Sequence, residues 1–127
     1  MRAFLLVGLG GWVGAFARYT MDRWVIHWIG SQFPYGTLLI NLIGCLILGF
    51  LGTLARDRLV AIPAEVWLLA SYGFLGAFTT FSTFSFETLR MLEDARFLAA
   101  LANLLGSVLG GLLACYLGAV IARSLAG

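Results

Sequence analysis

Apolar residues run through the chain in four long stretches, which are separated by short segments that hold most of the charged residues. The first stretch covers residues 3–17 and is followed by an apolar patch at 24–29; the others cover 33–55, 66–86 and 97–122. A helix needs about 20 apolar residues to cross a bilayer, because each residue rises only about 1.5 Å. Pro34 and Pro63 stand at the edges of these stretches, where the start of a helix tolerates proline. The pattern therefore predicts an all-α integral membrane protein of four transmembrane helices.

Composition agrees with a membrane protein and excludes a soluble globule. Hydrophobic residues make up 61% of the chain and charged residues only 11%, whereas a soluble domain carries about 25% charged residues. The net charge of +2 is too small to indicate binding to nucleic acid. We expect residues 1–127 to form a single four-helix domain whose surroundings are the lipid bilayer.

The first stretch has an alternative interpretation as a cleaved signal peptide, since Arg2 precedes an apolar run. No convincing small-residue cleavage site follows it, however, and Gly8, Gly11 and Gly14 suit helix packing better. We therefore expect this stretch to remain part of the protein.

The arginines are divided evenly between the two sides that four spans would create. One side has Arg2, Arg56, Arg58 and Arg123, and the other has Arg18, Arg23, Arg90 and Arg96. Positive residues normally concentrate on the cytoplasmic side, so an even count gives no preferred orientation. This favours a dual topology, in which the chain inserts in both orientations. The alternative is that Arg18 lies within the membrane and the count is uneven.

The small size of the chain points to an assembly. Four helices can barely enclose a route for a solute, and the sequence has no obvious repeat that would supply the inverted halves that transporters commonly use. An antiparallel homodimer creates that inverted symmetry from a single chain. We therefore expect a dual-topology antiparallel homodimer.

Polar residues inside the apolar stretches are informative, because an unsatisfied polar group is costly in lipid. Thr37 and Asn41 are four residues apart and share one helix face, and Asn103 and Ser107 do the same in the last stretch. Each pair could simply bond one helix to another, and for Thr37 and Ser107 that alternative is about as good as a functional role. Together the two pairs favour a hydrogen-bonding track for a small solute.

The third stretch carries the strongest local anomaly, within residues 73–87. Its middle and end contain five hydroxyl residues, which are Thr79, Thr80, Ser82, Thr83 and Ser85, and four phenylalanines, which are Phe78, Phe81, Phe84 and Phe86. Hydroxyl groups compete for backbone hydrogen bonds, and glycine weakens a helix, so we expect the third helix to be broken near its middle. Irregular backbone survives at membrane depth only if it is buried in protein or lines a cavity. Freed carbonyls could bind a cation, whereas freed amides or hydroxyls could bind an anion.

The spacing of three between Phe78, Phe81 and Phe84 would make these rings project together if the segment stayed close to helical. The edge of a phenyl ring is electropositive, so such rings could contact an anion that has lost part of its water. An aromatic stripe in a membrane helix more often serves packing alone. The adjoining hydroxyl residues make a role in binding an anion more plausible here than in an ordinary stripe.

The sequence lacks the residues of a pump or an enzyme. No carboxylate falls within the first, second or fourth stretch, and Glu87 only closes the third, whereas a proton-coupled pump keeps an ionisable group in the membrane. No nucleotide-binding loop or nucleophile elbow is present. Cys45 and Cys115 lie in mid-span without metal-ligand partners nearby in sequence, and we interpret them as small core residues and not as a disulfide. A passive, selective pore fits best.

Two other functions remain open at this point. A small multidrug-type transporter with dual topology has the same size and helix number, but it requires a carboxylate in the first helix, and residues 3–17 have none. An assembly subunit without transport activity would also show small-residue helix packing, but it would carry no ion flux.

Three motifs resemble the Fluc family of fluoride channels, also called CrcB. They are residues 11–19 (GWVGAFARY), 35–44 (YGTLLINLIG) and 73–87, the last containing Phe-Thr-Thr-Phe-Ser-Thr-Phe. The motifs occur in the family's order, and the resemblance extends over essentially the whole chain. It implies a dual-topology homodimer in the bacterial inner membrane with two parallel fluoride pathways. These pathways would lower cytoplasmic fluoride, because hydrogen fluoride enters as a neutral molecule, ionises in the cytoplasm and leaves its anion trapped.

The resemblance also implies roles for particular residues. Backbone carbonyls of Gly76 and Thr79 would hold a structural sodium ion at the centre of the dimer, and Arg18 and Glu87 would have structural roles. The expected fluoride pathway consists of Asn41, Phe81, Phe84, Thr37, Ser82, Thr83, Asn103 and Ser107. Some family members have a tyrosine where this chain has Asn103, so the role of Asn103 departs from the family pattern.

Overall fold

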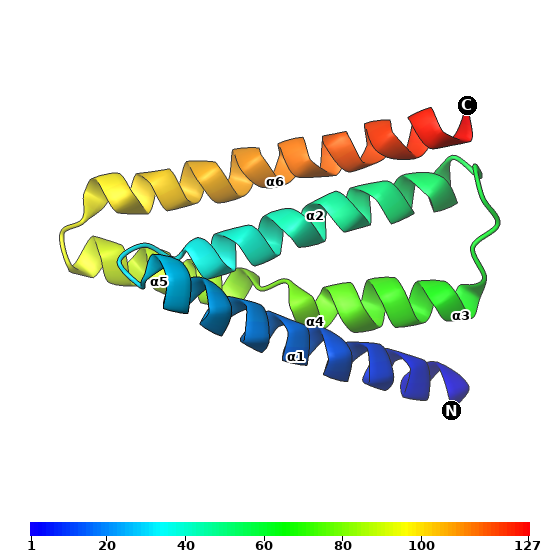
Figure 1. The fold of residues 1–127 in the computed structure, drawn as a ribbon, viewed down its shortest axis with the longest axis horizontal. Coiled ribbons are helices and arrows are strands. Elements are labelled where there is room, and N and C mark those ends of the chain that lie inside the picture. Colours follow the sequence, from blue (N-terminus) through cyan, green and yellow to red (C-terminus); the bar gives the residue numbers. More distant parts are fainter.

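The computed structural model describes residues 1–127 and consists of helices without any strand. In chain order the elements are α1 (Arg2–Ile29), α2 (Tyr35–Arg56), α3 (Ala64–Trp67), the π-helical segment η1 (Leu68–Leu75), α4 (Gly76–Phe78), α5 (Phe81–Glu93) and α6 (Phe97–Ala126). They form four rods that lie side by side and alternate in direction, so that both termini lie at the same end (Figure 1). The third rod is composed of α3, η1, α4 and α5, and it is visibly interrupted. The all-helical fold and the broken third helix are confirmed.

The ends of the helices follow from residues that stop or start a helix. α2 begins directly after Pro34, and α3 begins directly after Pro63, as their positions predicted. α1 is longer than expected, because it continues through Arg18 and the charged residues after it until Gly30 ends it with φ of 94°. Arginine is a good helix former, and no proline or glycine interrupts this segment, so the charges alone did not end the helix.

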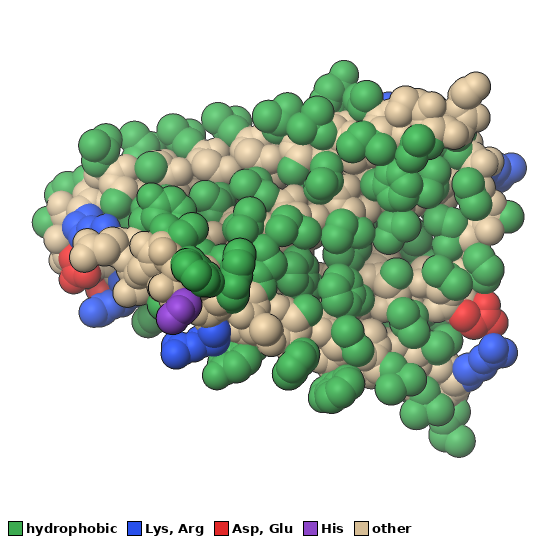
Figure 2. Space-filling view, viewed as in Figure 1, with side chains coloured by type: hydrophobic (Ala, Val, Ile, Leu, Met, Phe, Trp, Pro, Cys, Tyr) green, Lys and Arg blue, Asp and Glu red, His purple; other side chains and the backbone are tan.

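Three helices, α1, α2 and α6, are individually long and apolar enough to cross a membrane. The third rod reaches across the molecule only as a series of shorter segments. Only 20 of the 127 residues are buried, and large apolar side chains cover the outside. In Figure 2 apolar side chains spread over most of the visible face, and the charged side chains gather towards the two ends. This distribution suits a bilayer, in which apolar surface faces lipid.

Glycines bring the helix backbones into contact in two places. A Cβ atom added to Gly118 of α6 would lie 2.2 Å from the carbonyl oxygen of Leu46 in α2, and one added to Gly14 of α1 would lie 2.2 Å from that of Phe74 in η1. No side chain fits at such distances, so glycine is required at both positions. Small residues allow this close approach inside lipid, where packing replaces the hydrophobic driving force. α2 thus pairs with α6, and α1 pairs with the first half of the third rod.

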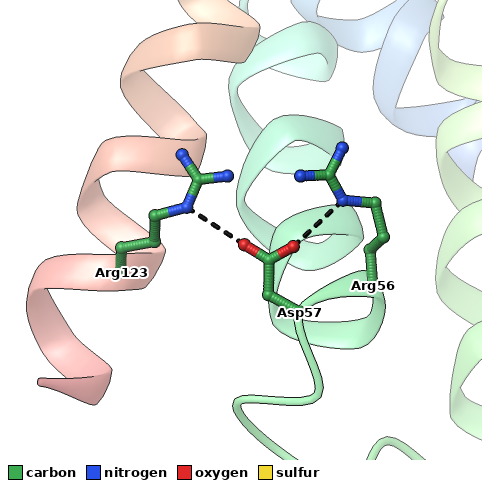
Figure 3. A network of polar contacts seen from close by, with 3 residues as sticks. All are labelled: Arg56, Asp57 and Arg123. Atoms are coloured by element: carbon green, nitrogen blue, oxygen red, sulfur yellow. Dashed lines mark hydrogen bonds and ion pairs between the residues drawn. The ribbon is translucent and has the colours of Figure 1, made fainter.

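An ion network joins the ends of α2 and α6. The Oδ1 atom of Asp57 accepts a hydrogen bond from Nε of Arg56, and its Oδ2 atom accepts one from Nε of Arg123, both at 3.0 Å (Figure 3). These bonds, first the one from Arg56 and then the one from Arg123, hold the pKa of Asp57 below its usual value. The network lies at the end of the molecule that also carries both chain termini (Figure 1).

Candidate functional site

The break in the third rod is held open by a side chain from α2. Thr79 and Thr80 have extended backbone conformations between α4 and α5. The N–H of Thr80 donates to Oδ1 of Asn41 at 2.8 Å, and Nδ2 of Asn41 donates to the carbonyl of Thr80 at 3.0 Å. This reciprocal pairing fixes which amide atom points where. Asn41 therefore satisfies both backbone groups of one residue at a point where the helix cannot.

The hydroxyl groups after the break are organised by Thr80. Its Oγ1 accepts a hydrogen bond from the backbone N–H of Thr83 at 3.2 Å, which makes Thr80 the N-cap of α5. The same hydroxyl lies 2.9 Å from Oγ1 of Thr83 and 3.3 Å from Oγ of Ser82. Ser82 and Thr83, both expected on the pathway, are thus linked to each other through Thr80.

The break leaves backbone carbonyls without their helical partners. In an unbroken helix the N–H of Thr80 would donate to the carbonyl of Gly76, but here it donates to Asn41. The carbonyl of Thr79 accepts no hydrogen bond from any backbone or side-chain group. Gly76 itself is exposed, and a Cβ atom there would meet nothing closer than 3.7 Å. The two carbonyls expected to bind a cation are therefore both released from helical hydrogen bonding by the same break.

A cavity of about 340 Å³ brings six of the expected site residues together. Asn41, Gly76, Thr79, Phe81, Phe84 and Ser107 all line it, with residues that include Cys45, Ser71 and Thr80. The rings of Phe81 and Phe84 have centroids 5.6 Å apart and planes inclined at 53°. Phe84 is buried, whereas Phe81 is 79% exposed and projects outward from the chain. The cavity thus combines polar groups of the break with two aromatic rings.

Phe78 does not join these two rings. It is buried and stacks on Phe74 with a centroid distance of 5.4 Å, on the other side of the break. The stripe of three rings considered in the sequence would need a continuous helix, and Thr79 and Thr80 are extended. The break therefore separates Phe78 from Phe81 and Phe84.

A second cavity, of about 230 Å³, lies on the α1 side of the break. Arg18, Asp22, Thr37 and Thr83 line it together with Thr80. Arg18 makes no ion pair and no hydrogen bond within the chain, and it is partly buried. It lies beside Thr80 at the break and not at the end of the molecule. Arg18 therefore does not count fully towards one side of the membrane, and the division of the arginines between the two sides is less even than four against four.

Glu87 and Thr37 connect α5 with the first turn of α2. Oγ1 of Thr37, which is buried, donates to Oε1 of Glu87 at 2.8 Å. Oε2 of Glu87 is buried and has no hydrogen-bond partner. Glu87 is therefore partly buried in the middle of α5, at the level where α2 begins.

Asn103 and Ser107 have different surroundings although they share a helix face. Asn103 is 1% exposed, and its Nδ2 donates at 2.9 Å to Oγ1 of Thr88, which in turn donates to the carbonyl of Phe84 at 2.8 Å. Asn103 lines neither of the two cavities. Oγ of Ser107, by contrast, is buried without a partner at the first cavity. The hydroxyl of Ser107 is therefore left without a partner beside the cavity, whereas the side chain of Asn103 links α6 to α5 through Thr88.

Sequence reasoning gave no individual role to Thr80 or Thr88. The spacing of Thr80 and Thr83 is that of an N-cap residue and the third residue of its helix, which could have located the start of α5. Nothing in the sequence indicates that Thr88 would meet Asn103, because that contact depends on how two helices pack.

Comparisons with known proteins agree with the motifs. Residues 5–119 match the family described as "CrcB-like protein, Camphor Resistance (CrcB)". The "Fluoride-specific ion channel FluC 2" of Moorella thermoacetica is 47% identical over 123 residues, which are 97% of this chain and 98% of the relative. The "Fluoride-specific ion channel FluC" of Magnetococcus marinus is 49% identical over 92% of this chain and 94% of the relative. That of Geobacter metallireducens is 42% identical over 98% of this chain and 100% of the relative. The resemblance inferred from the sequence is confirmed.

Proposed function

Because the chain belongs to the CrcB-like protein family, we propose that it is a passive, fluoride-selective ion channel. It is a multi-pass membrane protein, and its bacterial relatives support a location in the cell inner membrane. The observation that carries the proposal is the break at Thr79 and Thr80, which lies between two cavities that gather polar groups inside an otherwise apolar molecule. Family membership excludes the multidrug-type transporter.

The groups around the break suit a small anion. Fluoride that leaves water needs hydrogen-bond donors, and donors to a charged acceptor form bonds about twice as strong as neutral ones. Ser107 offers a hydroxyl that bonds to nothing else, and Asn41 keeps one amide hydrogen after its bond to Thr80. The electropositive ring edges of Phe81 and Phe84 add weaker contacts. Arg18 supplies positive charge beside the same break.

The working unit in this proposal is an antiparallel homodimer. Phe81 projects from the single chain with most of its ring exposed, although it lines the first cavity. A second copy would cover this ring and close the cavity. Arg2, Arg56, Arg58 and Arg123 lie at or near one end, and of the other four only Arg18 lies deep in the molecule, so the bias in orientation remains small.

A structural sodium ion in the dimer also belongs to the proposal. Hard cations prefer oxygen ligands, and backbone carbonyls are among those that proteins use. The carbonyl of Thr79 has no partner and that of Gly76 lacks its helical one, so both residues fit such an ion. The ion would bind carbonyl oxygens from both chains and offset the repulsion between their partial negative charges.

Fluoride efflux from liposomes tests the function directly. Purified protein is reconstituted into vesicles loaded with potassium fluoride, and external fluoride is followed with an electrode after the membrane potential is short-circuited. We expect rapid release of fluoride and no comparable release of chloride. Absence of flux from correctly folded protein would favour the alternative of an assembly subunit.

Biased orientation tests the dimer. Three lysines added after Gly127 should force that end into the cytoplasm in every chain, because positive residues are retained there. A second copy with lysines in the connection at 93–96 should take the opposite orientation. Each copy alone should fail to confer fluoride resistance, and the two together should restore it. Full resistance from one biased copy, with its orientation verified by a terminal reporter, would show that the working unit is not antiparallel.

A further inference from the structure

The only two cysteines of the chain lie together between α2 and α6. Sγ of Cys115 donates to the carbonyl oxygen of Cys45 at 3.2 Å. The thiol of Cys45 lies over Gly111, where an added Cβ atom would come within 3.4 Å of its sulfur. Gly111 and Cys115 are four residues apart and share one face of α6. Both thiols therefore occupy the same gap between α2 and α6.

The gap is accessible and adjoins the candidate pathway. Both cysteines are free thiols and only partly buried. Cys45 lines the 340 Å³ cavity that Asn41, Phe84 and Ser107 also line. Cys45 therefore lies in the wall of this cavity, and the thiol of Cys115 lies against the backbone of Cys45.

We propose that Cys45 and Cys115 form a two-coordinate binding site for a thiophilic divalent cation of the mercuric type, in the wall of the conduction cavity. Thiol sulfur is a soft ligand and selects soft cations. Two sulfurs suit an ion that binds linearly, whereas Zn²⁺ requires four ligands and the chain offers no cluster of three. Zn²⁺ is therefore the expected weak competitor.

Charge neutrality favours a divalent ion at this depth. Binding breaks two S–H bonds, forms two S–Hg bonds and releases two protons to solvent, with no change in oxidation state. The product, a mercury atom between two thiolates, carries no net charge. A monovalent soft ion such as Ag⁺ held between two thiolates would leave one negative charge in the apolar interior, which is unfavourable without a partner. To stay neutral, Ag⁺ would have to use one thiolate and one protonated thiol, which is a weaker ligand.

Metal binding is measured on the purified full-length protein in detergent, in chloride-free buffer with Hg²⁺ as the probe. Intact mass should increase by one mercury atom less two protons per chain. Competition with a soluble dithiol should give an affinity that falls about 100-fold or more in Cys45→Ser and in Cys115→Ser, because the second thiol then no longer acts at high effective concentration. Two mercury atoms per chain, bound independently and retained singly by each variant, would refute a shared site. Absence of binding would refute it as well.

The effect of Hg²⁺ on conduction rests on the proposed function and is measured in a separate experiment from metal binding. Fluoride efflux is compared before and after Hg²⁺ within each protein, so that no assumption about basal rates is needed. Hg²⁺ is added at a concentration that saturates the parent protein but lies well below the dissociation constant of Cys115→Ser. We expect it to abolish efflux in the parent protein, a soluble dithiol to restore that efflux, and Cys115→Ser to be unaffected at the same concentration. Unchanged efflux from protein that has bound one mercury per chain would contradict the placement beside the pathway. Absence of efflux before Hg²⁺ is added would contradict the channel function and leave the binding result untouched.

Discussion

Replacement of Asn41 by leucine should break the contact that organises the centre of the molecule. The asparagine side chain makes two hydrogen bonds, both to the backbone of Thr80. Leucine is of similar size but can neither donate nor accept, so the N–H and C=O of Thr80 would lose their partners together. Thr80 is only 8% exposed, and any water that replaced those bonds would have to come from the two cavities that Thr80 lines. We expect Asn41→Leu to lose fluoride efflux and to unfold more readily.

The magnitude follows from the two orphaned groups. A buried donor or acceptor left without a partner costs about 1–3 kcal/mol, so the two together cost roughly 2–6 kcal/mol. The lower part of this range applies if the two segments next to the break relax towards solvent. Because whole domains are stable by only about 5–15 kcal/mol, even the lower value is easily measured.

The free energy of unfolding is measured by titration of the reconstituted protein with denaturing detergent, followed by circular dichroism. Ser107→Ala is the matched control, since the Ser107 hydroxyl is buried without a partner and its removal breaks no bond. We expect Ser107→Ala to conduct less but to unfold normally. Stability of Asn41→Leu within about 0.5 kcal/mol of the parent, which is typical of an unimportant surface change, would refute the role of Asn41 at the break. If that stable variant also failed to conduct, Asn41 would act by direct contact with fluoride.

Three further changes test separate parts of the structure. Gly118→Ala should destabilise the pair of α2 and α6, because its Cβ atom would lie 2.2 Å from the carbonyl oxygen of Leu46. Gly52→Ala is the control, since its Cβ atom meets open space, and it should stabilise the protein by up to about 1 kcal/mol. Thermal unfolding compares the two variants. Thr80→Val keeps the size of the side chain but removes the N-cap acceptor of α5, and it should cost about 1 kcal/mol in the same measurement. Because its two arginine neighbours lower the pKa of Asp57, its ion network contributes stability above about pH 4 and loses it as the pH falls through the lowered pKa. The difference in thermal stability between the parent and Asp57→Asn should therefore be largest at neutral pH and vanish in acid, and a difference independent of pH would contradict this.

Much of the fold could be predicted because a bilayer permits few solutions. Four apolar stretches can cross it only as helices, and prolines at 34 and 63 mark where two of them begin. The break was also predictable, because the hydroxyl residues from Thr79 to Ser85 compete with helical hydrogen bonding. The end of the first stretch at residue 17 was a wrong prediction for the end of α1, which continues to Ile29 because arginine is compatible with a helix.

The fine arrangement of the site could not be predicted, because it depends on how helices dock. The spacing of Asn103 and Ser107 shows only that they share a helix face. In the structure Asn103 bonds to Thr88 of α5, whereas the hydroxyl of Ser107 has no hydrogen-bond partner. The glycines of α6 differ in the same way. A Cβ atom at Gly106 or Gly110 would meet only leucine side chains, whereas Gly118 supports a backbone contact. Spacing gives the face of a helix, and packing decides which of its residues are critical.

The division of the third rod has a consequence for biosynthesis. Its first half packs against α1, and its second half, α5, packs mainly against α6, which is translated after it. When α5 leaves the ribosome, its main partner does not yet exist, and none of the segments of this rod is long enough to cross a bilayer alone. Asn41, however, is already in the membrane by then, and its two bonds to Thr80 are available as soon as the break arrives. The order of synthesis thus allows α2 to retain the unfinished rod until the last helix is inserted.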